Sequence, residues 1–311
     1  MGVNWSMIYR KSGPLGWYAV HTPFGKRYMM MVNMDDILVS LPFFSYGALT
    51  KNEPDVVDNK VEFTFDGKQL TCNDPKVRWH VRMLRPVSEH FHTVKVVSWL
   101  RLAETPQAQL SRFSSNVRRK INKAISNEIK LETGGLELVG QFYGVVAHNM
   151  HRLGAPSMSR SFYSGIVEAF GRDATVLIAK HHGKAIGGAI WLKRGDYGEA
   201  CWFSTLEDYN SFYTSYFLWW SCIKHSIERN CKVFSFGRST RDSGPHLYKQ
   251  QWGARNSTLY WSFSYPPRND QFKIGPLRIN MPDRTILSFL WKISPCFIIR
   301  WLGPMVAGKF Y

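Results

Sequence analysis

The alternation of apolar and polar positions divides the chain into a strand-rich first third, a basic helix, and a second unit of helices and strands. Short apolar runs that end at Pro, Gly or Asn predict strands in the first third. They lie at residues 28–32, at 37–49 with an interruption at Pro42, at 77–84 and at 94–102. The interruption at Pro42, close to Gly47, indicates either a shaped loop or a proline-broken edge strand.

Residues 106–131 predict a helix. Val117, Ile121 and Ala124 recur at helical spacing, and Ser114 or Ser115 can cap its start. The other side of this helix is basic and is either a solvated face or a site for phosphate groups. Gly134 and Gly135 end the segment and predict a domain boundary.

The pattern after this boundary predicts helix, helix, three antiparallel strands, helix, strand, strand. The two helices cover residues 136–153 and 159–171, and Ser159 can cap the second. The strands lie at residues 175–180, 185–193 and 198–205, with turns between them. A long apolar helix that ends at Asn230 follows, and then strands at 233–236 and 259–265.

The stretch 233–253 carries the densest candidate chemistry. We predict a strand that breaks at Gly237 into a loop holding Arg238, Arg241 and His246. A strand ending in such a loop presents basic and histidine side chains at a sheet edge. The alternative is a surface loop with incidental charge.

Composition limits the classes of function. The chain has 311 residues, of which 44% are hydrophobic, so it is long and apolar enough for one or two packed domains. Its formal charge of +17 favours polyanionic partners: phosphorylated ligands, RNA or an anionic membrane surface. Five dispersed cysteines argue against a disulfide framework and against a zinc site. We find neither a signal peptide nor a membrane-spanning segment, and expect a cytoplasmic protein.

The order of elements and several motifs resemble the Fem-type (FemAB/FemX-like) aminoacyl transferases, and more narrowly the FemAB-related proteins associated with PEP-CTERM/exosortase systems. The likeness covers roughly residues 32–253 and is carried by these stretches: 38–43, 46–47, 116–124, 151–156, 236–239, 248–249 and 252–253. The resemblance implies an α+β fold of tandem GNAT-like domains, with mixed, mostly antiparallel sheets flanked by helices. The N-terminal unit is shorter than in the family. We accordingly expect three parts: a partial GNAT-like domain at 1–133, a second at 134–267, and a basic, aromatic tail at 268–311.

The resemblance also implies transfer of an acyl or aminoacyl group onto an amine of a phosphorylated or lipid-linked cell-envelope or exopolysaccharide intermediate. Lys249 matches the lysine of the family's aromatic-Lys motif and would stabilise an oxyanion or the donor's phosphate end. Arg238 would orient a phosphate or carboxylate. Ser235 stands where relatives often carry an acid, which leaves His246 or a substrate group as the candidate base. The expected substrate-binding residues are Tyr248, Phe236, Ser239, Arg241, Tyr46, Arg118, Arg119 and Lys123.

Three further expectations concern donors, partners and alternatives. We expect no cofactor and no metal, with aminoacyl-tRNA or an acyl thioester as co-substrate. Residues 206–213, ahead of the long helix, contain two acids and no glycine, a poor cradle for the pyrophosphate of coenzyme A. A CoA-dependent N-acetyltransferase is therefore a second alternative. The first alternative is a catalytically degenerate GNAT-like protein that acts as a membrane-surface or scaffold protein of a polysaccharide or protein export system. It would lie at the inner face of the cell membrane through residues 283–311, whose aromatic and basic residues suit an interfacial segment.

Overall fold

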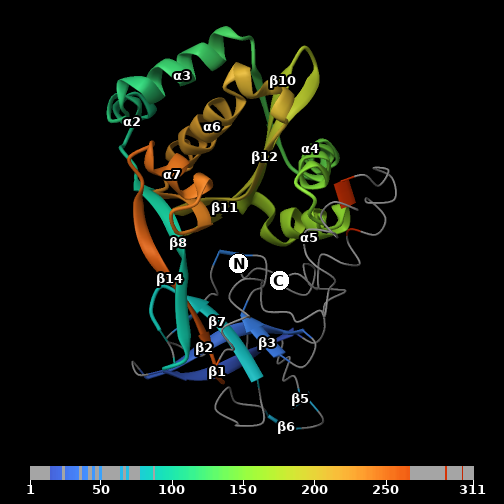
Figure 1. Cartoon of the computed structure of the whole chain (residues 1–311), viewed down its shortest axis with the longest axis vertical. Helices are drawn as coiled ribbons and strands as arrows, with labels where there is room; N and C mark the ends of the chain where they lie inside the picture. Colours follow the sequence, from blue (N-terminus) through green and yellow to red (C-terminus); the bar gives the residue numbers. More distant parts are fainter. Residues whose placement is uncertain are drawn as a thin grey trace.

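The computed structural model describes residues 15–22, 25–34, 37–40, 44–45, 49–50, 64–65, 68–69, 78–86, 88–266, 291–292 and 303 (Figure 1). It confirms the predicted fold class, because a large, mostly antiparallel sheet is flanked by helices. Tyr46 and nearly all of the predicted tail lie outside the described residues, so the predictions about them stay predictions. Among the described helices, none has both the length and the apolar character needed to cross a bilayer.

The strands are β1 (Leu15–Thr22), β2 (Gly25–Met34), β3 (Ile37–Ser40), β4 (Leu49–Thr50), β5 (Thr64–Phe65), β6 (Lys68–Gln69), β7 (Arg78–Met83), β8 (Phe91–Arg101), β9 (Lys130–Gly134), β10 (Ala174–His181), β11 (Lys184–Arg194), β12 (Tyr197–Thr205), β13 (Val233–Thr240) and β14 (Arg255–Phe263). The main sheet has the order β1-β2-β3-β7-β14-β8-β13-β12-β11-β10-β9, with β4 on β2. The late strand β14 lies between β7 and β8, so one sheet runs through both predicted units. Where those units divide stays a prediction.

The α-helices are α2 (Pro106–Ser111), α3 (Ser115–Ser126), α4 (Val139–Arg152), α5 (Arg160–Phe170), α6 (Thr214–Glu228) and α7 (Gly244–Gln250). Short 3-10 helices are η2 (Leu136–Leu138), η3 (Gly171–Asp173) and η4 (Glu207–Phe212). In Figure 1, α3, α6 and α7 lie on one side of the upper sheet and α4 and α5 on the other. This half of the sheet is therefore buried on both faces.

Strand β10 shows how the pattern builds two cores. Leu177 and Ala179 pack with the α3 and α6 side chains, whereas Val176 and Ile178 pack with those of α4 and α5. Successive strand residues point to opposite faces, so a continuously apolar strand serves both cores. Burying both faces holds the middle of the sheet rigid, which is the place where the candidate site lies.

The helix predicted at 106–131 is wrong in its extent. Two helices replace it, and residues 130–134 form the edge strand β9. Thr105 caps α2, whose first turn holds Pro106, and the hydroxyl of Ser114 accepts from the amide of Val117 to start α3. A second N-cap inside the predicted helix therefore restarts it. The predicted cap Ser159 is confirmed at the start of α5.

The loop predicted after Gly237 is also wrong in part. Strand β13 continues through Gly237 to Thr240, and residues 244–250 form helix α7. The chain turns between them at Asp242, which has a φ of 59°. The stretch is thus strand, tight turn and helix, and the candidate residues belong to regular elements.

Candidate active site

A bulge in β13 shapes the site. Ser235 pairs with Trp99 of β8 and Arg238 with Val97, so two residues of β13 stand opposite one of β8. Gly237 takes up the extra length with a φ of 72°, a conformation that favours glycine. The hydroxyl of Ser235 accepts from the Gly237 amide at 3.0 Å and holds this turn. The bulge directs the backbone carbonyls of Gly237 and Arg238 toward α7.

Beside this bulge, the two central strands separate. β12 and β13 pair in parallel only from Tyr197 to Glu199, opposite Val233 to Ser235. Past those pairs a cavity of about 480 Å³ lies between them. Its lining residues are Ser45, Ala200, Cys201, Trp202, Phe203, Ser215, Trp219, Phe236, Gly237, Arg238, Pro245, Tyr248 and Lys249. A cavity of this size fits a small ligand or a reacting segment of a larger one.

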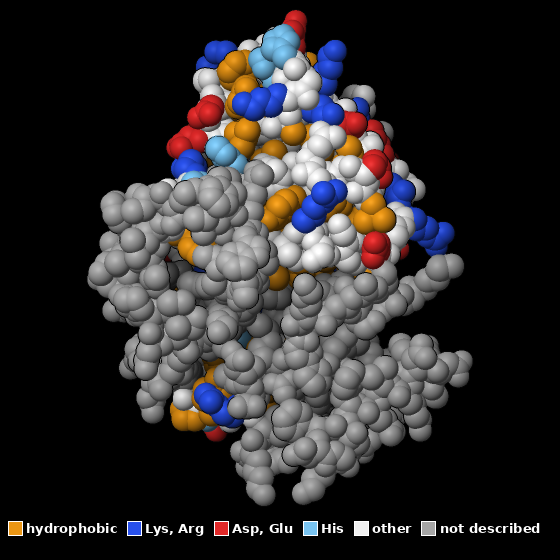
Figure 2. All heavy atoms as spheres, turned by 90° about the vertical axis from the view of Figure 1, so that its right-hand side faces the viewer, with side chains coloured by type: hydrophobic (Ala, Val, Ile, Leu, Met, Phe, Trp, Pro, Cys, Tyr) orange, Lys and Arg blue, Asp and Glu red, His pale blue; other side chains and the backbone are white. Residues whose placement is uncertain are grey.

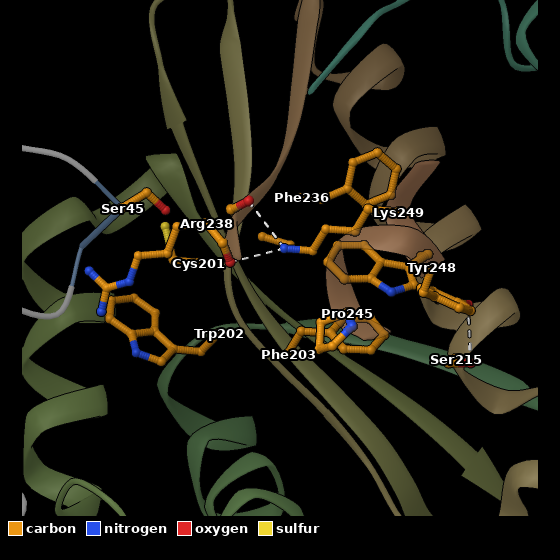
Figure 3. A pocket seen from close by; sticks show the side chains of 13 residues that line it. Ser45, Cys201, Trp202, Phe203, Ser215, Phe236, Arg238, Pro245, Tyr248 and Lys249 are labelled. Atoms are coloured by element: carbon orange, nitrogen blue, oxygen red, sulfur yellow. Dashed lines mark hydrogen bonds between the residues drawn. The ribbon is translucent and has the colours of Figure 1, made fainter. Parts of the chain in front are cut away.

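The lining comes from both faces of the sheet. Figure 3 shows Arg238, Trp202 and Ser45 on one side of the separating strands, and Lys249 and Tyr248 on the other. The first group packs toward α4 and α5, and the second belongs to α7 beside α6. Two ligands that enter from opposite faces could thus meet at the bulge.

Lys249 is the central polar group of the cavity. Its side chain is buried, and Nζ donates to the carbonyls of Gly237 and Arg238, each at 3.1 Å. Burial lowers the pKa of this amine from 10.5 to about 7; the carboxylate of Glu199 raises it and Arg238 lowers it. A neutral amine has two N–H bonds and one lone pair. With both N–H groups on carbonyls, the lone pair remains for a proton.

Aromatic side chains fix the surroundings of Lys249. Phe203 and Trp219 stack with ring centroids 3.9 Å apart, and Phe236 lies 4.8 Å from Trp219. The hydroxyl of Tyr248 bonds Ser215 at 3.2 Å, and burial raises the pKa of this phenol well above its ordinary value. These rings surround the buried lysine with apolar surface.

Glu199 is a site residue that sequence reasoning missed. It is fully buried on β12, opposite Ser235 of β13. Its Oε2 accepts from Arg194 at 3.1 Å, and its Oε1 accepts from the hydroxyl of Ser45. Its place beside the site depends on the register of β12 against β13, which the sequence does not reveal. An acid inside an otherwise apolar strand was nevertheless a sequence signal for a buried, paired carboxylate.

Arg238, which the family resemblance suggests as a group that orients a phosphate or carboxylate, lines the cavity. Its Nη1 donates to the carbonyl of Phe44 at 2.7 Å, which ties β13 to the segment after β3. Phe44 in turn packs against Trp202 at 5.4 Å. Arg238 thus joins the first third of the chain to the cavity.

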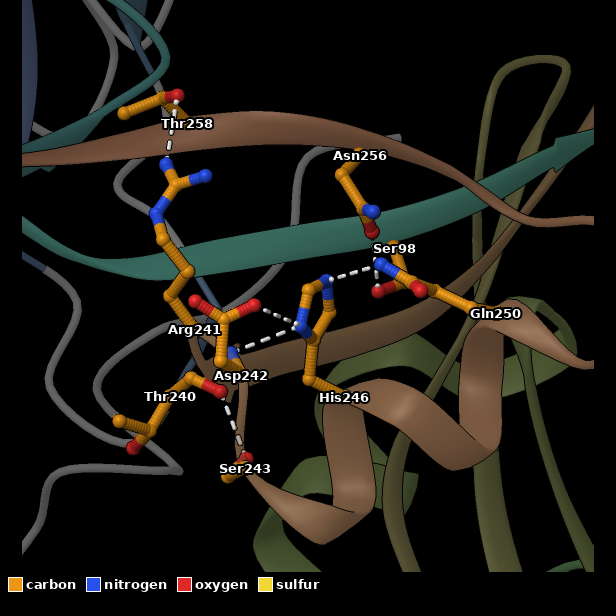
Figure 4. Close-up of polar contacts among 9 residues, drawn as sticks. All are labelled: Ser98, Thr240, Arg241, Asp242, Ser243, His246, Gln250, Asn256 and Thr258. Carbon is orange, nitrogen blue, oxygen red and sulfur yellow. Dashed lines mark hydrogen bonds and ion pairs between the residues drawn. The ribbon is translucent and has the colours of Figure 1, made fainter.

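His246, Arg241 and Ser239 do not line the cavity. Figure 4 shows His246 beside the turn: its Nδ1 accepts from the amide of Asp242 at 3.0 Å, and its Nε2 lies 3.1 Å from the side-chain amide of Gln250. Arg241 donates to the hydroxyl of Thr258 at 3.2 Å. Ser239 is buried within β13. These contacts hold the turn and β14 in place.

The predicted basic residues of α3 lie outside the cavity. Arg118 donates to the carbonyl of Ser111 at 3.2 Å, Arg119 to Asn116 at 3.1 Å, and Lys123 lies 5.6 Å from the ring of Tyr213. Their neighbour Lys120 donates to the hydroxyl of Tyr216 at 2.9 Å.

That lysine connects α3 to the cavity, because the ring of Tyr216 lies 5.2 Å from that of Tyr248. On the face of the molecule seen in Figure 2, the described basic and acidic side chains are interspersed. The view in Figure 2 does not include α3, and the basic side of that helix stays a prediction as a phosphate-binding surface.

Comparison with known proteins agrees with this geometry. Residues 111–250 match the family described as the acetyltransferase (GNAT) domain. The match spans α3 to α7 and contains most of the cavity lining. No curated protein matches the chain in sequence.

Solved structures share the fold at low identity. The crystal structure of FemX is 12% identical, covers 86% of this chain and 92% of that chain, and has a TM-score of 0.55. The C-terminal domain (DUF2156) of an Agrobacterium fabrum protein assigned as a lysylphosphatidylglycerol synthetase is 11% identical, covers 80% and 84%, and has a TM-score of 0.50. A protein of unknown function from Bacteroides thetaiotaomicron is 9% identical, covers 82% and 86%, and has the same TM-score. The chain thus has a GNAT-like fold and a segment that matches the acetyltransferase (GNAT) domain.

Proposed function

We propose that this protein transfers an acyl or aminoacyl group onto an amine, with Lys249 as the proton-transfer residue. The observation that carries the proposal is the buried amine of Lys249, held by two carbonyls inside a cavity that both faces of the sheet line. A general base with a pKa near the working pH is effective, since it is free to accept a proton and still able to return it. The GNAT-domain match supports the same reaction class.

The chemistry follows from the neutral amine. The acceptor nitrogen forms a bond to the acyl carbon, and its proton passes to the lone pair of Lys249 while the carbonyl oxygen takes the electron pair. The new ammonium then stands beside the oxyanion and stabilises it. When the carbonyl re-forms, the bond to the donor's oxygen or sulfur breaks. The leaving group takes the proton back, which restores the neutral lysine.

The donor approaches from the side of α3 and α6. Ser215, in the first turn of α6, lines the cavity, and Lys120 and Lys123 reach the neighbouring tyrosines. The segment before α6 has no glycine and carries the exposed acids Glu207 and Asp208; Glu207 pairs with Arg152 at 3.0 Å, which leaves Asp208 to disfavour a pyrophosphate there. Cations on a helix face suit the phosphate backbone of a donor such as an aminoacyl-tRNA. A coenzyme A donor would instead need a glycine-rich turn to hold its pyrophosphate.

The acceptor approaches from the side of Arg238. An arginine fork beside an aromatic wall suits an amine-bearing molecule that also carries a phosphate or carboxylate. A lipid- or nucleotide-linked intermediate of the cell envelope or of an exopolysaccharide has this chemistry.

The test is a panel of two labelled donors, tRNA charged with labelled amino acids and labelled acyl thioesters of coenzyme A. Each is offered to a lysine-containing, nucleotide-linked peptide and to an aminosugar phosphate. We expect label in a base-stable amide with the wild-type protein, and at least about a 100-fold loss in Lys249→Met. Lys224→Met, an exposed lysine of α6, is the matched control and keeps full activity. Absence of labelled amide from every pairing would count against the proposal.

A further inference from the structure

Glu199 is a buried carboxylate that the transfer step above does not use. Its side chain has no exposed surface, and it is paired with Arg194 and with the hydroxyl of Ser45. Burying a carboxylate away from water disfavours its charged form, and a buried ion pair often adds no net stability. A buried charge kept at this cost, next to a candidate site, indicates a role in that site.

The position of Glu199 relative to the lysine is specific. Glu199 and Ser235 are ladder partners on one face of the sheet, and Gly237 follows two residues after Ser235. A Cβ added to Gly237 would stand 3.6 Å from Oε1 of Glu199 and 3.4 Å from Oγ of Ser45. On its other side, the Gly237 carbonyl accepts from Lys249. The backbone at Gly237 therefore lies between the carboxylate and the amine.

We propose that Glu199 is a positioning residue for the amine of Lys249. The carboxylate holds Ser45 and Arg194 against the bulged strand, and its negative charge acts on the amine across Gly237. This role for Glu199 rests on the proposed transfer function, because an amine that carries a proton during transfer must be able to change between its neutral and charged forms. Glu199 is not one of the residues that line the cavity, so we assign it no proton transfer of its own.

The charges around Lys249 leave Glu199 with a distinct effect. Arg238, on β13, lowers the pKa of the lysine, whereas Glu199, on β12, raises it. Burial raises the pKa of the Cys201 thiol and the pKa of the Tyr248 phenol well above their ordinary values, so both groups stay neutral. Arg194 of β11 lies beyond the carboxylate that it binds. Among the described groups, Glu199 is thus the anion that supports the protonated lysine.

The experiment measures the titration of Lys249 directly. Competitive labelling of amines with fluorodinitrobenzene, from about pH 5 to about pH 10, followed by peptide mass spectrometry, reports the neutral fraction of each lysine. Glu199→Gln keeps the shape but removes the charge; its amide oxygen can still accept from Arg194, and its NH2 group can donate to the hydroxyl of Ser45. We expect the apparent pKa of Lys249 to fall by about one unit, a roughly tenfold change in the neutral-to-charged ratio at a given pH. Adding Ser235→Asp to this variant places a carboxylate on β13, opposite residue 199 of β12, and should raise the pKa of Lys249 again.

A wild-type titration of Lys249 in Glu199→Gln overturns the proposal, as does a failure of Ser235→Asp to raise the pKa. Since Glu199→Gln leaves Arg194 without its carboxylate, Glu199→Gln combined with Arg194→Met removes both charges and guards against unfolding. The same fall is expected there. Glu228→Gln, on the surface of α6, is the control that leaves Lys249 unchanged. The labelling needs no substrate, so its outcome is separate from any failure to detect transfer.

Discussion

The amine of Lys249 lies 3.1 Å from the backbone carbonyl of Gly237, a residue of the neighbouring strand in a left-handed conformation. The bulge that places this carbonyl also separates β13 from β12 and so opens the cavity. One local irregularity therefore creates the space for substrates and binds the side chain that acts on them. Strained or bulged backbone of this kind is common beside active sites.

Stability should depend on pH through Lys249. The unfolded lysine titrates at 10.5 and the folded one at about 7. Below pH 7 both states hold the proton, and burial of the charge weakens the folded state. Between pH 7 and 10.5 the unfolded chain binds more protons, so the free energy of unfolding rises with pH, by at most roughly 1.4 kcal/mol per unit. Urea unfolding at several pH values should show this rise in wild type relative to Lys249→Met; parallel curves would contradict it.

Gly237→Ala should impair both stability and transfer. A φ of 72° strains an L-residue by about 1–2 kcal/mol, and relief of this strain would shift the Gly237 carbonyl that accepts from Lys249. Thermal unfolding and the transfer rate are measured together. Gly195→Ala is the matched control, because Gly195 has a φ of 62° with open space around its Cβ. We expect the control to lose similar stability and no activity. Equal activity loss in both variants would mean that the backbone conformation at Gly237 has no specific role in transfer.

His246→Gln should act on stability rather than on catalysis. The imidazole holds the turn at Asp242 and lies outside the cavity lining. Losing a buried hydrogen bond of this kind costs about 1–3 kcal/mol. The free energy of unfolding should fall while the transfer rate of the folded protein stays within about twofold. A rate loss comparable to that of Lys249→Met would restore His246 as the base that the sequence suggested.

The double variant Lys120→Met, Lys123→Met should weaken donor binding. Both ammonium groups lie against tyrosines beside the start of α6, where a donor phosphate would pass. We expect KM for a phosphate-bearing donor to rise about tenfold and kcat to change little, with a smaller effect at high salt. Lys224→Met is again the control. An unchanged KM would remove α3 from the donor path.

Much of the fold could be predicted because its elements have clear periodicity. The cavity residues Lys249, Arg238, Phe236 and Tyr248 were predicted from the family resemblance, and the structure brings them together. Helix α7 was missed because its seven residues are too few for a periodic pattern, although Pro245 after Ser243 is a helix-start signal.

The role of Glu199 could not be predicted in the same way. Its proximity to Lys249 depends on the register of β12 against β13 and on the bulge after Ser235. Both are properties of the packed sheet, and the local sequence of β12 contains neither. Strand β13 carries Ser235 where relatives often carry an acid, and the adjacent strand supplies a carboxylate, Glu199, at the paired position.

The most direct test of the central claim is the pH dependence of the single-turnover transfer rate, compared between wild type and Lys249→Met. The account predicts that the wild-type rate rises about tenfold per pH unit below a midpoint near pH 7, as Lys249 loses its proton, and then levels off. The variant should be at least about 100-fold slower and lack this midpoint. A variant that keeps the wild-type rate, or the same midpoint, would contradict the assignment of Lys249 as the proton-transfer residue.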